Sequence, residues 1–134
     1  MIKGACLCGD VQYELNGELD VLAVCHCDQC KRAQGTAFVT NAPVDGRQFK
    51  ITQGQDKLSA YESSSNKFRY FCSQCGSPIY SQRTDMPEQV RIRVGTVTHG
   101  HIPKPSFQIY CEAKASWLQL DQGEPQYPQG PTAK

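Results

Sequence analysis

Short stretches in which apolar and polar residues alternate are spread along the chain, which is the pattern of half-buried β-strands. The first covers residues 11–15, and the turn signal Asn16-Gly17 follows it directly. Similar stretches cover residues 38–44, 49–51, 68–72, 90–94 and 109–111, and a short apolar run covers 21–24. Residues 28–35 have room for one short helical turn, and no longer stretch has a helical period. The pattern therefore predicts a mostly β protein.

The length of 134 residues suits one domain. From residue 121 onward the chain is poor in apolar residues and rich in Pro, Gly and Gln, so we expect a domain over 1–120 and a flexible tail over 121–134. The formal net charge of +1 argues against a nucleic-acid partner, and no apolar run is long enough for a membrane span. The N-terminal residues contain no apolar leader, so we expect a cytoplasmic protein.

Cysteine is the unusual feature of the composition, with eight residues. Seven of them form three tight groups, which are Cys6-x-Cys8, Cys25-x-Cys27-x-x-Cys30 and Cys72-x-x-Cys75. Cysteines one or two residues apart pair poorly as disulfides but chelate a single ion well. Because no export signal is visible, metal binding is favoured over a disulfide framework. Ligand sets made only of cysteine, outside a redox context, favour zinc over iron.

The first and third groups together supply four thiolates, which is the ligand number of a closed tetrahedral zinc site. The side chains of Cys6 and Cys8 point the same way if this segment is extended. Gly76, directly after the third group, tolerates the left-handed backbone of a metal-binding turn. A saturated site of this kind stabilises the fold. The spacing leaves open whether Cys6 and Cys8 join the central group instead.

The central group supplies three thiolates within six residues. Zinc with three protein ligands keeps one position open, as a catalytic site requires, whereas Cys111 or a histidine as fourth ligand would close the site. Spacing alone does not decide between these two cases. Zinc with three thiolates has a formal negative charge, so it activates water poorly and suits the binding and deprotonation of a thiol. An open site would favour attack of a thiolate on an electrophilic carbon, or the reverse cleavage.

Three motifs occur in order along the chain, namely Gly4-x-Cys6-x-Cys8-Gly9, Cys25-His26-Cys27-x-x-Cys30 and Phe71-Cys72-x-x-Cys75-Gly76. In these motifs the sequence resembles the glutathione-dependent formaldehyde-activating enzyme family, which also includes centromere protein V. The resemblance covers about residues 3–120. The chain departs from the family in a late segment, where His-Ile-aromatic is common and this chain has Gln108-Ile109-Tyr110. A histidine that lined the pocket would imply a different substrate here.

The resemblance implies a β-tent fold, in which small antiparallel sheets are joined by zinc sites. It implies two zinc ions per chain, a structural one on Cys6, Cys8, Cys72 and Cys75 and a catalytic one on Cys25, Cys27 and Cys30. It also implies a carbon–sulfur lyase that forms S-hydroxymethylglutathione from glutathione and formaldehyde. The substrates would then be a small thiol and a small aldehyde.

Two other functions stay open at this stage. A non-catalytic, zinc-stabilised module that binds another protein would have both metal sites closed, with Cys111 as the eighth ligand. A thiol–disulfide redox enzyme would need a free reactive cysteine, and only Cys111 remains once both zinc sites are filled.

Several residues near these motifs have expected roles of their own. His26 stands between two ligands, so we expect it to point away from the metal and support the site. Lys31 and Arg32 would either anchor the carboxylates of a peptide-like thiol or form a solvated pair. Phe38 and Trp117 are expected to lie in the core.

Overall fold

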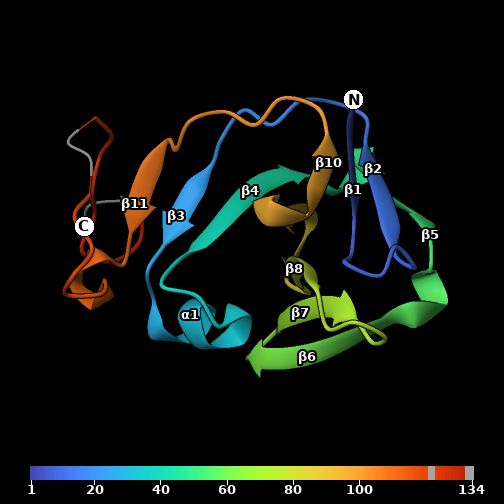
Figure 1. The fold of residues 1–134 in the computed structure, drawn as a ribbon, viewed down its shortest axis with the longest axis horizontal. Coiled ribbons are helices and arrows are strands. Elements are labelled where there is room, and N and C mark those ends of the chain that lie inside the picture. The colour runs from blue at the N-terminus through green and yellow to red at the C-terminus, as the bar shows by residue number, and fades with distance from the viewer. Residues whose placement is uncertain (121–122, 132–134) are drawn as a thin grey trace.

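The structure is a computed structural model that describes residues 1–120 and 123–131. In these residues the chain forms a small sheet, a larger sheet and one short α-helix (Figure 1). The small sheet has the order β10-β1-β2-β5 and is antiparallel throughout. Its strands are β1 (Ile2–Ala5), β2 (Gln12–Leu15), β5 (Phe49–Gln53) and β10 (Val97–His99).

The larger sheet has seven strands in the order β11-β3-β4-β9-β8-β7-β6. These strands are β3 (Ala23–Cys25), β4 (Val39–Asp45), β6 (Leu58–Ser64), β7 (Lys67–Cys72), β8 (Pro78–Arg83), β9 (Met86–Arg93) and β11 (Phe107–Ile109). All neighbours are antiparallel except β3 and β11, which pair in parallel. Short 3-10 turns cover Gly46–Gln48, Gln55–Lys57, Val94–Thr96 and Cys111–Ala113. The prediction of a mostly β fold of small antiparallel sheets is confirmed.

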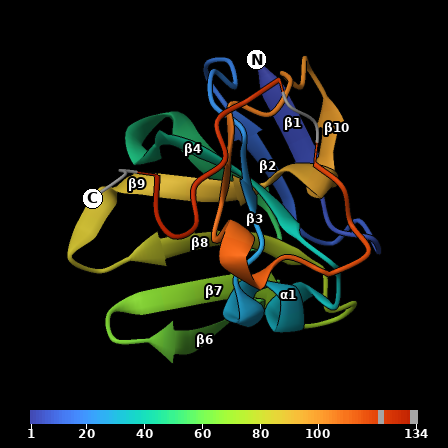
Figure 2. The same ribbon diagram turned by 90° about the vertical axis from the view of Figure 1, so that its left-hand side faces the viewer.

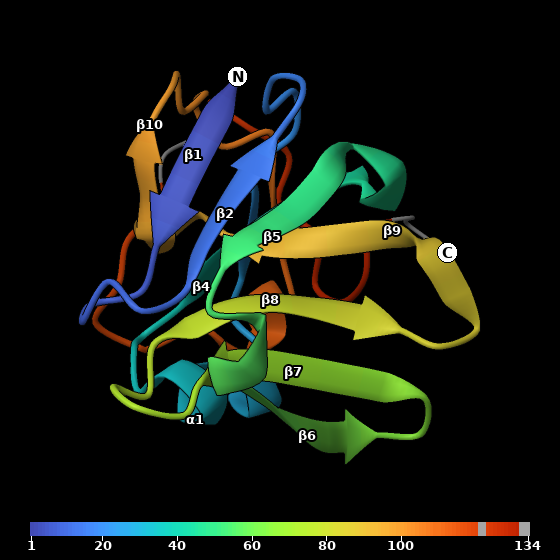
Figure 3. The same ribbon diagram turned by 90° about the vertical axis from the view of Figure 1, so that its right-hand side faces the viewer.

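The main core lies between the two sheets, whose strands cross each other in Figure 3. In β2 the alternation read from the sequence is realised, since Tyr13 and Leu15 are buried and Gln12 is exposed. From the larger sheet, Ile92 and Tyr80 face the same core, and the Tyr80 ring stacks on Tyr70 with centroids 4.4 Å apart. Burial of these side chains is the main stabilisation of the packed sheets.

Proline in the middle of a sheet strand normally removes a ladder hydrogen bond. Pro43 is nevertheless part of β4, between β3 and β9 in the sheet order. Strand β3 pairs with β4 only as far as Asn41, so Pro43 lies beyond the end of β3 and pairs with Arg91 on the other side alone. The short β3 therefore leaves this proline at a local edge, where its missing N–H removes no bond.

Helix α1 (Asp28–Gln34) is longer than the single turn that the sequence predicted. The Cys27 sulfur caps its N-terminus by accepting a hydrogen bond from the Cys30 N–H at 3.3 Å. Gly35 ends it in the left-handed conformation with φ of 67°. The helix lies beside β6 and β7 (Figures 1 and 2), to which Gln29 is joined by a 3.1 Å hydrogen bond to the Ser63 carbonyl. No helix in the described part of the chain is long and apolar enough to cross a membrane.

Residues 121–134 were expected to form a flexible tail, and of these 121–122 and 132–134 lie outside the described residues. Within residues 123–131, the part around Gln126 lies beside β11. The Gln108 N–H donates to the Pro125 carbonyl at 2.8 Å, and the Tyr127 N–H donates to the Gln108 carbonyl at 2.9 Å. This stretch is therefore attached to the sheet by backbone hydrogen bonds.

The expectation that Phe38 and Trp117 belong to the core was wrong. Phe38 is 37% exposed and Trp117 is 71% exposed. Apolar character alone does not decide burial when the segment lies on the outside of the sheets.

Candidate metal centres

The first cysteine cluster joins the two sheets. Cys6 and Cys8 follow β1 of the small sheet, whereas Cys72 ends β7 of the larger sheet and Cys75 lies in the turn after it. The four sulfur atoms all lie within 4.8 Å of one another. The Cys8 sulfur is 3.6 Å from that of Cys6 and 3.8 Å from that of Cys72. A tetrahedral zinc ion with four thiolates separates its sulfurs by about 3.8 Å, so these residues fit such an ion.

Two similar turns build this cluster. In each turn a glycine with positive φ closes the chain, with φ of 84° at Gly9 and 80° at Gly76. The Gly76 N–H donates to the Cys72 carbonyl at 2.8 Å, and the Gly9 N–H donates to the Cys6 carbonyl at 3.1 Å. A side chain at either glycine would meet the strain of the left-handed region. The turn predicted at Gly76 is confirmed, whereas the extended conformation considered for Cys6 to Cys8 is not found, because β1 ends at Ala5 and a turn follows.

Backbone and hydroxyl donors also surround these sulfurs. The Val11 N–H donates to the Cys6 sulfur at 3.3 Å, and the Gln74 N–H donates to the Cys72 sulfur at 3.4 Å. The Ser77 hydroxyl, 3.3 Å from the Cys75 sulfur, lowers the pKa of Cys75 to about 5. Donors of this kind stabilise thiolates, which are the form that binds metal.

The second cluster lies where β3 passes into α1. Cys25 ends β3, Cys27 caps the helix and Cys30 is in its first turn. Their three sulfurs lie within 4.8 Å of one another, and in the described residues no fourth His, Cys, Asp or Glu belongs to the group. Cys111 is therefore not part of it. Cys25 and Cys30 are buried, whereas Cys27 is half-buried.

The sulfurs of this trio influence one another strongly. Hydrogen bonds from the Cys25 and Cys27 sulfurs hold the pKa of Cys30 far below its usual range, and the Arg69 guanidinium adds to this effect. Hydrogen bonds with Cys27 and Cys30 raise the pKa of Cys25. Three crowded thiols thus share protons, and all three become thiolates together only when a cation replaces those protons.

Arg69 of β7 is the charged neighbour of this trio. Its Nη2 atom lies 3.6 Å from the Cys30 sulfur and donates to Gln29 Oε1 at 3.1 Å, and its Nε donates to the Ser63 hydroxyl at 3.0 Å. The side chain is buried, with 8% exposure. Arg69 carries no signal of a site in the sequence, because an arginine that alternates with apolar residues in a strand has the pattern of a solvent-facing residue.

His26 supports the cluster from behind. It is fully buried, and its Nε2 lies 2.7 Å from Oε1 of Gln108 in β11. The Gln108 amide nitrogen donates to Glu124 Oε1 at 2.8 Å, which turns the amide oxygen toward His26. Since that oxygen can only accept, His26 Nε2 carries the proton. The late glutamine at which the sequence departs from the family pattern is therefore the partner of the histidine between the cysteines.

Lys31 and Arg32 have separate roles in the structure. Lys31 Nζ donates to the Ala113 carbonyl at 2.6 Å and so ties α1 to the turn Cys111–Ala113. Arg32 forms an exposed ion pair with Asp28 at 3.4 Å, one helical turn away. Arg32 is exposed and also lines the cavity beside α1, whereas Lys31 is bonded to the backbone. The role of these residues as an anchor for a carboxylate stays a prediction.

A family model described as glutathione-dependent formaldehyde-activating enzyme matches residues 1–113, which include both cysteine clusters. This chain belongs to the glutathione-dependent formaldehyde-activating enzyme family. A protein of Halomonas elongata whose name includes the words "glutathione-dependent formaldehyde-activating enzyme" is 23% identical over 133 residues, covering 92% of this chain and 83% of that protein. A protein of Schizosaccharomyces pombe named as an uncharacterized lyase is 28% identical over 62% of this chain, which spans 58% of that protein.

A solved structure has the same fold as this member of the glutathione-dependent formaldehyde-activating enzyme family. It is a crystal structure of a Rhodobacter sphaeroides protein, with a TM-score of 0.60, 22% identity and coverage of 93% of this chain and 98% of that one. At this identity the likeness concerns the arrangement of the sheets. The chemistry is argued from the clusters themselves.

Proposed function

We propose that this chain is a zinc-dependent carbon–sulfur lyase, which adds a small thiol, glutathione, to a small aldehyde such as formaldehyde, or catalyses the reverse cleavage. The observation that supports this is the difference between the two clusters. One has four sulfurs and would be saturated by its own ligands, whereas the other has three in the described residues. An ion with three protein ligands has a position for a substrate atom.

The residues of the trio fit a thiophilic ion. Three cysteine sulfurs gathered within 4.8 Å match the donor set of zinc, and one of the three residues, Cys27, is only half-buried. Zinc bound by Cys25, Cys27 and Cys30 would lower the pKa of an incoming thiol and supply the thiolate that attacks the aldehyde. Arg69 and the N–H of Cys30, 3.3 Å from the Cys27 sulfur, would offset the negative charge that accumulates there.

The proposed reaction balances without an oxidant or reductant. A bond forms between the thiol sulfur and the aldehyde carbon, the carbonyl electron pair moves to the oxygen, and the proton released by the thiol ends on that oxygen. In the reverse direction the carbon–sulfur bond breaks and the aldehyde is regenerated. The chain's part is to hold its three sulfurs on two joined elements, the end of β3 and the start of α1, so that the thiol meets the aldehyde in a fixed orientation.

The four-cysteine cluster would hold the structural zinc of this proposal. Its ligands come from both sheets, so a bound ion would link them and add its binding energy to folding. We assign the protein to a reducing compartment, the cytoplasm, where these thiols stay reduced and glutathione is abundant.

Metal analysis and two matched variants test this proposal. We expect about two zinc ions per purified chain. Cys27→Ser should lose one zinc ion and should no longer form S-hydroxymethylglutathione, which NMR follows with glutathione and 13C-formaldehyde. Its thermal unfolding transition should stay sharp. Cys75→Ser should lose one zinc and much of the thermal stability. Cys111→Ser is the control and should keep both zinc ions and activity.

Two results would contradict the assignment of roles. If Cys27→Ser unfolds the chain as severely as Cys75→Ser, the trio is a structural site. If Cys111→Ser loses a zinc ion, the second site is closed and the chain is a zinc-stabilised binding module.

A further inference from the structure

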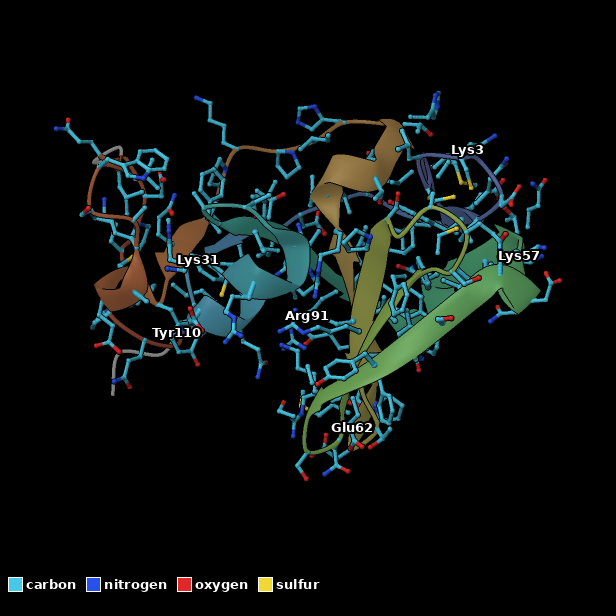
Figure 4. The ribbon with its side chains drawn as sticks, turned by 60° about the horizontal axis from the view of Figure 1, so that its bottom comes forward. Lys3, Lys31, Lys57, Glu62, Arg91 and Tyr110 are labelled. Atoms are coloured by element: carbon cyan, nitrogen blue, oxygen red, sulfur yellow. The ribbon has the colours of Figure 1, made fainter. Side chains whose placement is uncertain are left out.

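A row of cations crosses the face of the larger sheet that lies against α1. Arg69 in β7 is directly opposite Ser81 in β8, and Ser81 is directly opposite Arg91 in β9. Lys67 and Arg93 are two residues from Arg69 and Arg91 on the same strands, so all four cationic side chains project from this one face. Figure 4 shows Arg91 between α1 and the strands.

These cations are not neutralised by carboxylates. None of the ion pairs formed by the described residues includes Lys67, Arg69, Arg91 or Arg93. Other arginines do pair with carboxylates, which are Asp28 for Arg32, Asp45 for Arg47 and Asp85 for Arg83. The nearest negative groups are the thiolates of the trio. Four cations exceed three thiolates by one charge, and a bound zinc ion would raise that excess to three.

Burial makes this excess unfavourable for the protein alone. Arg93 is 3% exposed and Arg69 is 8% exposed. Burial, and then the charges of the neighbouring arginines, lower the pKa of Lys67, Arg91 and Arg93, to about 10 in the case of Arg93. A buried cluster of like charges is destabilising unless an anion binds beside it.

Two buried polar groups in the same row lack hydrogen-bond partners. Arg69 Nη1 has none, although the other nitrogens of its guanidinium are bonded, and Ser81 Oγ, fully buried between Arg69 and Arg91, has none either. Buried donors of this kind are normally satisfied, and a guanidinium beside a hydroxyl is suited to a carboxylate.

A cavity of about 570 Å³ adjoins this row, between α1 and strands β6 to β8. Its lining includes Gln29, Tyr61, Ser63, Arg69 and Arg93. Arg69 connects the cavity with the trio, because one end of its guanidinium contacts the Cys30 sulfur. The size of the cavity suits a ligand of a few residues. Its wall combines aromatic rings with Arg69 and Arg93, and the other members of the row lie behind these two arginines in the sheet.

We propose that Lys67, Arg69, Arg91 and Arg93, together with Ser81, form a subsite that binds a carboxylate of the substrate beside the three-cysteine cluster. This deepens the proposed function and rests on it for the position of the reacting sulfur. The carboxylate belongs either to the thiol, as in glutathione, or to an aldehyde that carries an acid group, as in glyoxylate. Both sources share the chemistry that the row recognises.

Binding measurements on the zinc-loaded protein test this subsite without turnover. The first probe is S-methylglutathione, which keeps both carboxylates and has no free thiol, compared with its diethyl ester, which has no carboxylate. The second pair is glyoxylate and its uncharged analogue glycolaldehyde. Isothermal titration calorimetry should show at least tenfold tighter binding of the charged member of one pair, and the pair that shows it identifies the source of the carboxylate.

Two charge variants and a matched control locate the effect. Arg91→Gln removes a cation whose side chain has no hydrogen-bond partner in the described residues, and Lys67→Gln removes a second one if the first variant folds poorly. Either variant should weaken the binding of the charged probe about tenfold and leave the affinity for the neutral analogue unchanged. Arg47→Gln, which removes an exposed arginine paired with Asp45, should change neither.

The outcomes separate the subsite from the lyase. Equal affinity for charged and neutral probes, absence of binding by every probe, or equal weakening of both members of a pair would overturn the subsite. If charged-probe binding depends on Arg91 and Lys67 but no thiol adduct forms with any aldehyde, the subsite stands and the lyase function fails. If the adduct forms while the charge variants have no selective effect, the lyase stands and the subsite fails.

Discussion

The hydrogen bond between His26 and Gln108 connects the central cysteine motif to β11, and its removal tests how the site is supported. The bond joins two fully or nearly fully buried side chains, with 0% exposure for His26 and 6% for Gln108. His26→Leu keeps most of the side-chain volume but leaves Gln108 Oε1 as a buried acceptor without a donor. An acceptor in this state costs about 1–3 kcal/mol. Gln108→Leu leaves the His26 Nε2–H without an acceptor at a similar cost.

The double variant removes both the His26 donor and the Gln108 acceptor, so neither group is left without the other. We therefore expect each single variant to lower the free energy of unfolding by about 2 kcal/mol, and the double variant to lower it by about 1–2 kcal/mol less than the sum. The assay is equilibrium unfolding in urea, in a fixed excess of zinc so that metal binding contributes equally to all variants. Glu124→Ala is the control, because it removes the other partner of the Gln108 amide at 2.8 Å.

Additive effects of the two single variants on the free energy of unfolding would contradict this prediction. If the two single changes add to within about 0.5 kcal/mol, the two side chains do not depend on each other and His26 is held by packing alone. The packing alternative has a concrete basis, since the His26 ring centroid lies 5.7 Å from that of Phe38. Coupling between His26 and Glu124 as strong as that between His26 and Gln108 would also contradict the pairwise account.

Three further predictions follow from other parts of the fold. Gly54→Ala should lower the free energy of unfolding in urea by about 3 kcal/mol, because φ is 79° and a Cβ there would overlap the Asp10 carbonyl. Gly35→Ala, where φ is 67° and the space is free, should lower it by about 1 kcal/mol. Equal losses in the two variants would contradict this prediction. Burial raises the pKa of Tyr13 from 10.0 to about 12, so above pH 10 the unfolded state holds fewer protons than the folded state. The free energy of unfolding should therefore fall between pH 10 and pH 12, and it should fall less steeply in Tyr13→Phe. Parallel profiles of stability against pH for the two proteins would contradict this prediction. A zinc chelator should lower the Tm of the purified protein, measured by calorimetry, by about 10 °C or more. It should lower the Tm of Cys75→Ser by less. An unchanged Tm of the purified protein would show that no metal supports the fold.

The electrostatics of the larger sheet link fold and function. Its core-facing side is apolar, with residues such as Ile92 and Tyr80, whereas the side against α1 carries the three-cysteine cluster and the four cations. One strand thus serves both purposes, since Ile92 lies between Arg91 and Arg93. A change in the register of β9 by one residue would exchange the two faces and disrupt the core and the site together.

Much of this protein is determined by its sequence alone, because the relevant interactions are local. The alternation in β2 specifies which side of the strand is buried, since successive side chains of a strand point to opposite faces. The spacing Cys72-x-x-Cys75 and the glycine after it specify a turn with positive φ at Gly76, whatever the rest of the fold. The fold class and the three-cysteine group within residues 25–30 follow from such local patterns.

Other features were decided by contacts between distant segments. Cys8 and Cys72 are 64 positions apart and meet only because the two sheets pack together. Helix α1 was underestimated because its N-terminal cap is a sulfur atom. The backbone bonds of Pro125 and Tyr127 to β11 also join segments whose pairing the local sequence does not indicate. The cations on β7 and β9 have the alternation of a solvent-facing row. Contacts with α1 cover part of this row, since Gln29 and Cys30 lie against Arg69. Burial depends on what covers a strand, and the strand's own sequence does not encode its neighbours.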